Sequence, residues 1–307
     1  MRTETRVSLP IANYLVLITN FFDFFVFRLQ TKNMKQILLF LILTTLLQSC
    51  TTIDIAEQDA FDVKKTISQD FFDNHEYKQE KVFIQHTKND YHLEGWYFTK
   101  PGNQQTVLYA GGNGFLMQTS RHIIPNLLKN DVDILFFNYS GYGNNQGEPS
   151  IENLRQDGFS AFRFLTEEKE ISADNIVMHG HSLGSVVASE IALSREVSGL
   201  VLESPVTDAN DMVDELVPWF ISLFVRFDID EKLTQSSNLE NIKKLDIPVM
   251  FAVGRKDQIT PPELSEKLYQ IAAEPKRIHI FEKGDHNNLP ELEEYRKALA
   301  EFYQNQL

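Results

Sequence analysis

Short, unbroken runs of apolar residues recur through the last two thirds of the chain. They lie at residues 107–110, 134–137, 176–178, 200–202, 249–253 and 278–281. Such runs are typical of parallel strands that are buried on both faces. Upstream, residues 81–87 and 91–99 are rich in Val, Ile, Tyr, Trp and His and flank a Lys-Asn-Asp turn. This pattern predicts an antiparallel strand pair at the start of the sheet.

Helical periodicity fills the stretches between these runs. Apolar residues recur at near-helical spacing from Ile151 to Leu165 and again from Leu292 to Phe302. Alternating strands and helices imply right-handed crossovers, and therefore an α/β fold with a mostly parallel, doubly wound sheet over residues 80–307. In such a sheet the functional site lies at the carboxyl ends of the strands.

Two segments depart from the alternation. Residues 205–245 show no clean strand and contain a dense aromatic and aliphatic cluster. This stretch is too long for a simple connection, which predicts a small helical insertion or cap. Residues 50–79 precede the domain and read as a polar tether with a short segment that leads into it.

The N-terminal 49 residues have the character of a targeting sequence. Residues 11–27 are apolar, but Asp23 and two asparagines interrupt them, which makes a poor membrane helix. A second unit begins at Met34, with Lys35, an apolar run over residues 37–47, and Cys50. Residues 47–50 resemble a bacterial lipobox, which implies lipidation of Cys50, removal of residues 1–49 and a lipid-anchored lipoprotein of the cell envelope. The alternative to a lipobox is a signal anchor with an incidental cysteine. A separate hypothesis is that translation starts at Met34 and that residues 1–33 are an upstream extension.

Composition narrows the class of protein further. The chain has 307 residues, a formal charge of −14 and one cysteine. An acidic surface repels phosphate backbones, so nucleic acid is not an expected partner. A single cysteine excludes an internal disulfide and a zinc site built on several thiolates.

A candidate nucleophile follows the third of the apolar runs. The sequence Gly-His-Ser-Leu-Gly at residues 180–184 stands between that strand and a helix of small residues. This is the context of a nucleophile elbow, in which a sharp turn presents Ser182 at the end of the sheet. The alternative, an ordinary strand–helix turn, does not call for a glycine on each side of the serine.

A candidate acid and a candidate base follow the last two strands. Asp257 comes after the run at 249–253, and His286 comes after the run at 278–281. We expect His286 to take the proton of Ser182 and Asp257 to orient the imidazole. Asp285 is the alternative acid, but an adjacent side chain in a turn points poorly toward its neighbour's ring.

A glycine-rich loop follows the first apolar run. It reads Ala-Gly-Gly-Asn-Gly-Phe over residues 110–115. We expect the backbone N–H groups of Asn113 and Leu183 to form an oxyanion hole. The alternative is a phosphate-binding loop, but the Lys-Ser/Thr pair of a P-loop is missing.

With these motifs, the chain from about residue 80 to its end resembles the α/β-hydrolase superfamily. It is most similar to the compact, small-capped serine hydrolases described as serine aminopeptidase-like or depalmitoylase-like. The segment from Asn138 to Ser150 also resembles that subgroup. Two positions depart from its pattern, because Gly111 replaces a usual histidine and Ser140 replaces a usual arginine.

The sequence therefore predicts a serine hydrolase of carboxylesters or thioesters that works without a metal or organic cofactor. A small-molecule or acyl-chain substrate is expected, and an apolar pocket for it is predicted at Phe115, Met117, Trp219, Phe220 and Phe224. Two alternatives remain open: a serine peptidase of the aminopeptidase-like kind, and a non-catalytic, membrane-anchored binding lipoprotein.

Overall fold

The structure, a computed structural model, describes residues 51–65, 76–120, 122–218, 221–222 and 225–305. It divides into two compact units. The larger unit contains Val63–Asp208 and Ser236–Leu307, and the smaller unit contains Met1–Asp62 and Ala209–Gln235. Cys50 and the upstream segment fall outside the described residues, as do Trp219, Phe220 and Phe224.

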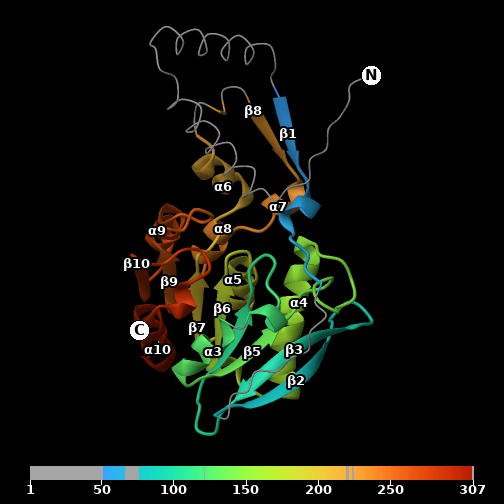
Figure 1. Cartoon of the computed structure of the whole chain (residues 1–307), viewed down its shortest axis with the longest axis vertical. Coiled ribbons are helices and arrows are strands. Elements are labelled where there is room, and N and C mark those ends of the chain that lie inside the picture. The colour runs from blue at the N-terminus through green and yellow to red at the C-terminus, as the bar shows by residue number, and fades with distance from the viewer. Residues whose placement is uncertain (1–50, 66–75, 121, 219–220, 223–224, 306–307) are drawn as a thin grey trace. The chain divides into compact units, whose positions relative to one another are not determined.

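The larger unit contains an eight-stranded sheet in the order β10-β9-β7-β6-β4-β5-β3-β2 (Figure 1). β3 runs antiparallel to both β2 and β5, and the other neighbours are parallel. The predicted α/β fold, with its mostly parallel sheet and antiparallel strand pair, is confirmed. The strands are β2 (Lys78–Gln85), β3 (His92–Thr99), β4 (Thr106–Ala110), β5 (Asp133–Phe137), β6 (Ile176–His181), β7 (Gly199–Glu203), β9 (Val249–Gly254) and β10 (Lys276–Phe281).

Helices cover both faces of this sheet. They are α3 (Ile124–Leu127), α4 (Ile151–Arg163), α5 (Gly184–Ser194), α8 (Asn238–Ile242), α9 (Pro262–Ile271) and α10 (Glu293–Asn305). Short helical turns lie at η2 (Met117–Thr119), η3 (Leu128–Asn130), η4 (Phe164–Glu168), η5 (Ala173–Asn175) and η6 (Leu289–Glu291).

Strand residues alternate between two cores because successive side chains point to opposite faces. Val177 and Met250 belong to a cluster with α3 and α10. Phe251 lies on the other face, where its ring meets Tyr269 of α9. Gly180 also lies on that face, against α5. Both faces of the central strands are therefore buried, which explains their unbroken apolar runs.

The order of the strands places the site. The chain passes from β3 through β4 to β5 on one side and then crosses to β6 on the other side of β4. The carboxyl ends of β4 and β6 are adjacent, with Ala110 paired to Gly180. This is the point where strand order reverses, and ligands of open α/β sheets bind at such points.

The smaller unit contains a strand pair and two helices. β1 (Thr51–Ile55) runs parallel to β8 (Val225–Ile229), and α6 (Ala209–Leu216), α7 (Glu231–Thr234) and η1 (Glu57–Ala60) complete the described part. The Asp230 side chain accepts a hydrogen bond from the Lys232 N–H at 3.0 Å and so caps α7.

The small helical insertion expected at 205–245, where no clean strand was predicted, contains a strand. β8 lies inside it, and its Val225, Phe227 and Ile229 alternate with polar residues. The segment expected to be a tether begins with the partner strand β1. Within the described residues, no helix is both long and apolar enough to span a bilayer.

Candidate active site

Ser182 stands in a strained turn between β6 and α5. Its φ is 51°, a left-handed value that few residues other than glycine adopt. The flanking glycines make the turn possible: a Cβ at Gly180 would lie 2.5 Å from the Gly184 carbonyl oxygen, and one at Gly184 would lie 2.1 Å from the Ala110 carbonyl oxygen. The Ser182 N–H donates to the Glu203 carbonyl at 2.9 Å, which fixes the turn to β7.

The structure brings Ser182, His286 and Asp257 together from three loops at the same edge of the sheet. His286 Nε2 lies 3.0 Å from Ser182 Oγ. His286 Nδ1 lies 2.9 Å from Asp257 Oδ2. Asp285 accepts instead from the N–H groups of Asn287 and Asn288, at 2.9 and 3.0 Å, and so closes its own turn. The arrangement fits proton transfer from serine to histidine, with the aspartate behind the ring.

Asp257 is buried and well supplied with donors. Its Oδ1 accepts from the N–H groups of Ile259 and Thr260, each at 2.9 Å, and the Thr260 hydroxyl lies 3.0 Å from its Oδ2. Burial acts to raise the pKa of Asp257, but the hydrogen bond from His286 and the Thr260 N–H outweigh burial and lower the pKa below its ordinary value. The side chain therefore remains a carboxylate at neutral pH. Sequence reasoning missed Thr260, although a threonine three residues after an aspartate is a turn signal.

The glycine loop after β4 packs directly against the serine. A Cβ at Gly112 would lie 3.1 Å from Ser182 Cβ, so a larger residue there would crowd the serine. Asn113 follows in the same loop. Leu183 precedes α5 as its N-cap residue, where an amide has no partner within the helix. The two residues expected to supply the oxyanion hole thus flank Ser182 on separate elements.

Two tyrosines from the segment after β5 hold this loop. The Tyr139 hydroxyl donates to the Gly111 carbonyl at 3.0 Å. The Tyr142 hydroxyl donates to Asn113 Oδ1 at 3.0 Å. The sequence indicated this segment through its family resemblance alone; the structure supplies a physical role for it, the support of the candidate oxyanion loop.

Ser140, which departs from the subgroup pattern, lies between these two tyrosines in the sequence and is buried. Its N–H and its hydroxyl both donate to Asp157 of α4, each at 2.7 Å. Tyr91 Oη lies 2.8 Å from Ser140 Oγ. Burial raises the pKa of Asp157 above its ordinary value despite the hydrogen bonds from His86 and Ser140 that act to lower it. Because the serine side chain is small, it fits beside the Asp157 carboxylate, which occupies the rest of this site.

A second buried polar network centres on Glu203, whose backbone carbonyl accepts from the Ser182 N–H. His179 Nε2 lies 3.0 Å from Glu203 Oε2, and the Tyr295 hydroxyl donates to the same oxygen at 2.6 Å. The Tyr303 oxygen lies 2.8 Å from His179 Nδ1. Burial acts to raise the pKa of Glu203, but the bond to His179 and its other partners lower it below the ordinary value. The network joins β6 and β7 to α10, and sequence reasoning did not find it.

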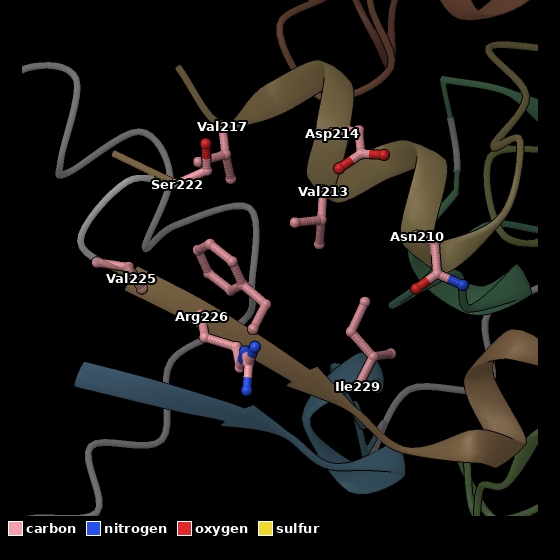
Figure 2. Close-up of a pocket in the computed structure, with 9 residues that line it drawn as sticks. Asn210, Val213, Asp214, Val217, Ser222, Val225, Arg226 and Ile229 are labelled. Atoms are coloured by element: carbon pink, nitrogen blue, oxygen red, sulfur yellow. The ribbon is translucent and has the colours of Figure 1, made fainter. Parts of the chain in front are cut away.

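Of the residues predicted to line an apolar pocket, the structure describes Phe115 and Met117. Phe115 and Met117 are buried in the hydrophobic core cluster, where Phe115 packs against Tyr109. The smaller unit has a pocket of its own, with a volume of about 550 Å³, between α6 and β8 (Figure 2). Its walls include Val213 and Ile229, with polar Asn210, Asp214 and Arg226. An acyl pocket at the predicted residues stays a prediction.

Among the described residues, no group of three or more His, Cys, Asp or Glu side chains is arranged to hold a metal ion.

Comparison with known proteins identifies the class. The family model of the alpha/beta hydrolase fold matches residues 107–241. An uncharacterized protein of Mycobacterium tuberculosis is 33% identical over 215 residues, which cover 69% of this chain and 74% of that protein. Protein bem46 of Schizosaccharomyces pombe is 31% identical over 209 residues, which cover 66% of this chain and 68% of bem46. The chain belongs to the alpha/beta hydrolase family.

Solved structures agree on the fold. The esterase Pf2001 of Pyrococcus furiosus superimposes with a TM-score of 0.64 at 17% identity, covering 80% of this chain and 97% of the esterase. An alpha-beta hydrolase of Vibrio vulnificus gives a TM-score of 0.62 at 23% identity, covering 78% and 89% of the two chains. At these identities the likeness concerns the fold alone.

Proposed function

We propose that this protein is a serine hydrolase that cleaves carboxylesters or thioesters of acyl groups through an acyl-Ser182 intermediate. The observation that carries the proposal is the chain of contacts from Ser182 Oγ through His286 to Asp257, at 3.0 and 2.9 Å. The strained elbow and the adjacent glycine loop support it, because both are positioned for attack on a carbonyl group. The esterase fold of the Pyrococcus relative is consistent with it.

The reaction follows from the geometry. Ser182 Oγ attacks the acyl carbonyl carbon while its proton passes to His286 Nε2. The carbonyl oxygen becomes an oxyanion, and the N–H groups of Asn113 and Leu183 stabilise it; one such donor is worth about 2.7–4 kcal/mol. The intermediate collapses, and His286 gives its proton to the departing alcohol or thiol. Water then attacks the acyl-serine, again with His286 as base, and releases the acid.

The test is active-site labelling of the full-length chain in detergent with a fluorophosphonate. We expect wild-type protein to be labelled and Ser182→Ala to be unlabelled, with p-nitrophenyl ester hydrolysis lowered about 10⁴-fold or more. Ser194→Ala is the matched control, since Ser194 ends the same helix and is exposed. Hydrolysis retained in Ser182→Ala would refute the assignment.

Two other results would redirect the proposal. Hydrolysis of aminoacyl amides at rates comparable with esters would favour a peptidase. A folded wild-type protein that takes no label would favour the non-catalytic binding protein.

We further propose attachment to a bacterial envelope membrane through a lipid on Cys50. The support is the lipobox-like sequence and the position of the single cysteine. Metabolic labelling with an alkyne fatty acid tests it: the wild-type protein should carry the label, and Cys50→Ser should lose the label and the membrane association together. Equal labelling of the two would contradict the anchor.

A further inference from the structure

His181, the residue before the nucleophile, contacts the loop that carries the candidate base. Its Nε2 lies 2.8 Å from the backbone carbonyl oxygen of His286, across 105 positions of sequence. The two imidazole rings lie 5.0 Å apart. A carbonyl oxygen can only accept, so Nε2 of His181 must carry the proton and Nδ1 must be bare in the neutral ring.

The unprotonated Nδ1 of His181 faces the glycine loop after β4. A Cβ at Gly112, in the glycine loop, would lie 2.8 Å from His181 Nδ1. His181 is thus bonded to Ser182 through the backbone. Its buried ring is hydrogen-bonded to the backbone of His286 and contacts the loop that carries Asn113. The other neutral tautomer would set a bare nitrogen against the His286 carbonyl oxygen, and a flipped ring would place Cε1 there, so only the Nε2–H form of this ring donates to that oxygen.

The His181 bond adds to the contacts that hold the loop of His286. Asp285 and Asn288 fix the turn around His286 through their side chains, with Asp285 N–H donating to Asn288 Oδ1 at 2.8 Å. The His181 bond reaches the peptide of His286 itself. A displacement of about 1 Å at a reacting group can cost about 10²-fold in rate.

We infer that His181 is a positioning residue, which holds the His286 imidazole on Ser182 through the Nε2–H hydrogen bond to the His286 carbonyl oxygen. This inference rests on the proposed function, in which His286 is the base. His181 does not touch the substrate and exchanges no proton during turnover.

The charges around the ring are compatible with a neutral donor. The groups that face His181 are Glu203 from β7, Asp257 from the loop after β9 and His286 from the loop after β10. Burial lowers the pKa of His181 and the charge of His286 lowers it further, whereas Glu203, the hydrogen bond to the His286 carbonyl and Asp257 act in the opposite direction without outweighing burial. At neutral pH the ring is uncharged and donates through Nε2.

Two amide variants separate positioning from packing. In His181→Gln the side-chain NH₂ reaches the place of Nε2, whereas in His181→Asn it stops near the place of Nδ1. Both are neutral, polar and smaller than histidine. With a p-nitrophenyl ester as substrate, we expect His181→Asn to lower kcat about 10- to 100-fold at unchanged KM, and His181→Gln to recover kcat to within about 3-fold of the wild-type value. Equal rates in the two variants, or an effect on KM alone, would overturn the inference.

A measurement without turnover completes the test. Nitrogen NMR of the histidine rings in the wild-type protein should show a protonated Nε2 and a bare Nδ1 at His181. The opposite tautomer would overturn the inference even if His181→Asn failed to fold. If the wild-type protein neither hydrolyses esters nor takes a fluorophosphonate, the proposed function fails, and the tautomer still decides whether the hydrogen bond exists.

Discussion

Removal of the His179 imidazole should destabilise the protein strongly, because it breaks a buried charged network. Glu203 is 1% exposed and His179 is fully buried. In His179→Leu, the Glu203 carboxylate loses a donor at 3.0 Å, and the Tyr303 hydroxyl loses its partner at 2.8 Å. A hydrogen bond to a charged group is worth about 1.5–3 kcal/mol, and a buried hydroxyl left without a partner costs about 1–3 kcal/mol. The expected loss of unfolding free energy is about 3–5 kcal/mol, the range found when removal of a partner leaves a buried charge uncompensated.

The double variant supplies the control. In His179→Leu with Glu203→Met, neither a buried charge nor its partner remains, and apolar replacement of a whole buried pair is often neutral. The Glu203 backbone carbonyl that accepts from Ser182 is unaffected by either change. We therefore expect the double variant to recover the part of the loss that comes from the Glu203 carboxylate, whereas the Tyr303 and Tyr295 hydroxyls lose their partners at 2.8 and 2.6 Å.

Urea unfolding followed by circular dichroism measures both variants. The single variant should unfold at much lower urea, with a melting temperature lower by about 10 °C. A cost below about 1 kcal/mol for His179→Leu would refute the reasoning. So would a double variant that is no more stable than the single one, since the cost would then come from lost packing.

Three further outcomes follow from the site. Asp257→Asn should lower kcat about 10³- to 10⁴-fold in steady-state ester hydrolysis. The reason is that an amide favours the wrong tautomer of His286 and cannot stabilise the imidazolium cation. A loss below about 10-fold would contradict the role proposed for Asp257. Tyr142→Phe removes the bond to Asn113 and should slow fluorophosphonate labelling about 5-fold with little change in melting temperature, whereas an unchanged labelling rate would show that the loop needs no such support. Burial lowers the pKa of His181 in the folded protein, so as pH falls below about 6.5 the unfolded chain takes up a proton that the folded protein refuses, and stability declines. In His181→Gln the melting temperature should depend less on pH between about pH 7 and 5. Burial also lowers the pKa of His279, but that residue is present in both proteins, so its contribution to the pH dependence is the same in each. Equal slopes would contradict this origin of the pH dependence.

The central sheet could be predicted from the sequence because its strands are buried on both faces. Runs such as 134–137 and 249–253 leave few alternatives to a parallel strand, and the observed β5 and β9 include them. Residues that follow such strands must gather at one edge, which is why Ser182, Asp257 and His286 could be proposed together.

Short elements that depend on distant partners could not be predicted in the same way. β1 and β8 have five residues each and pair across 174 positions of sequence. Their alternation is too brief to distinguish a strand from an irregular segment. The roles of His181, Thr260 and Tyr142 likewise depend on contacts that exist only after the loops have folded against each other.

The left-handed backbone at Ser182 has a consequence for how this protein can change over time. A residue with a side chain in that conformation carries about 1–2 kcal/mol of strain, which glycine would not carry. Replacement of Ser182 by glycine should therefore yield a more stable chain that has lost its nucleophile. A substitution that improves stability at this position would therefore remove the hydroxyl group on which the proposed reaction depends.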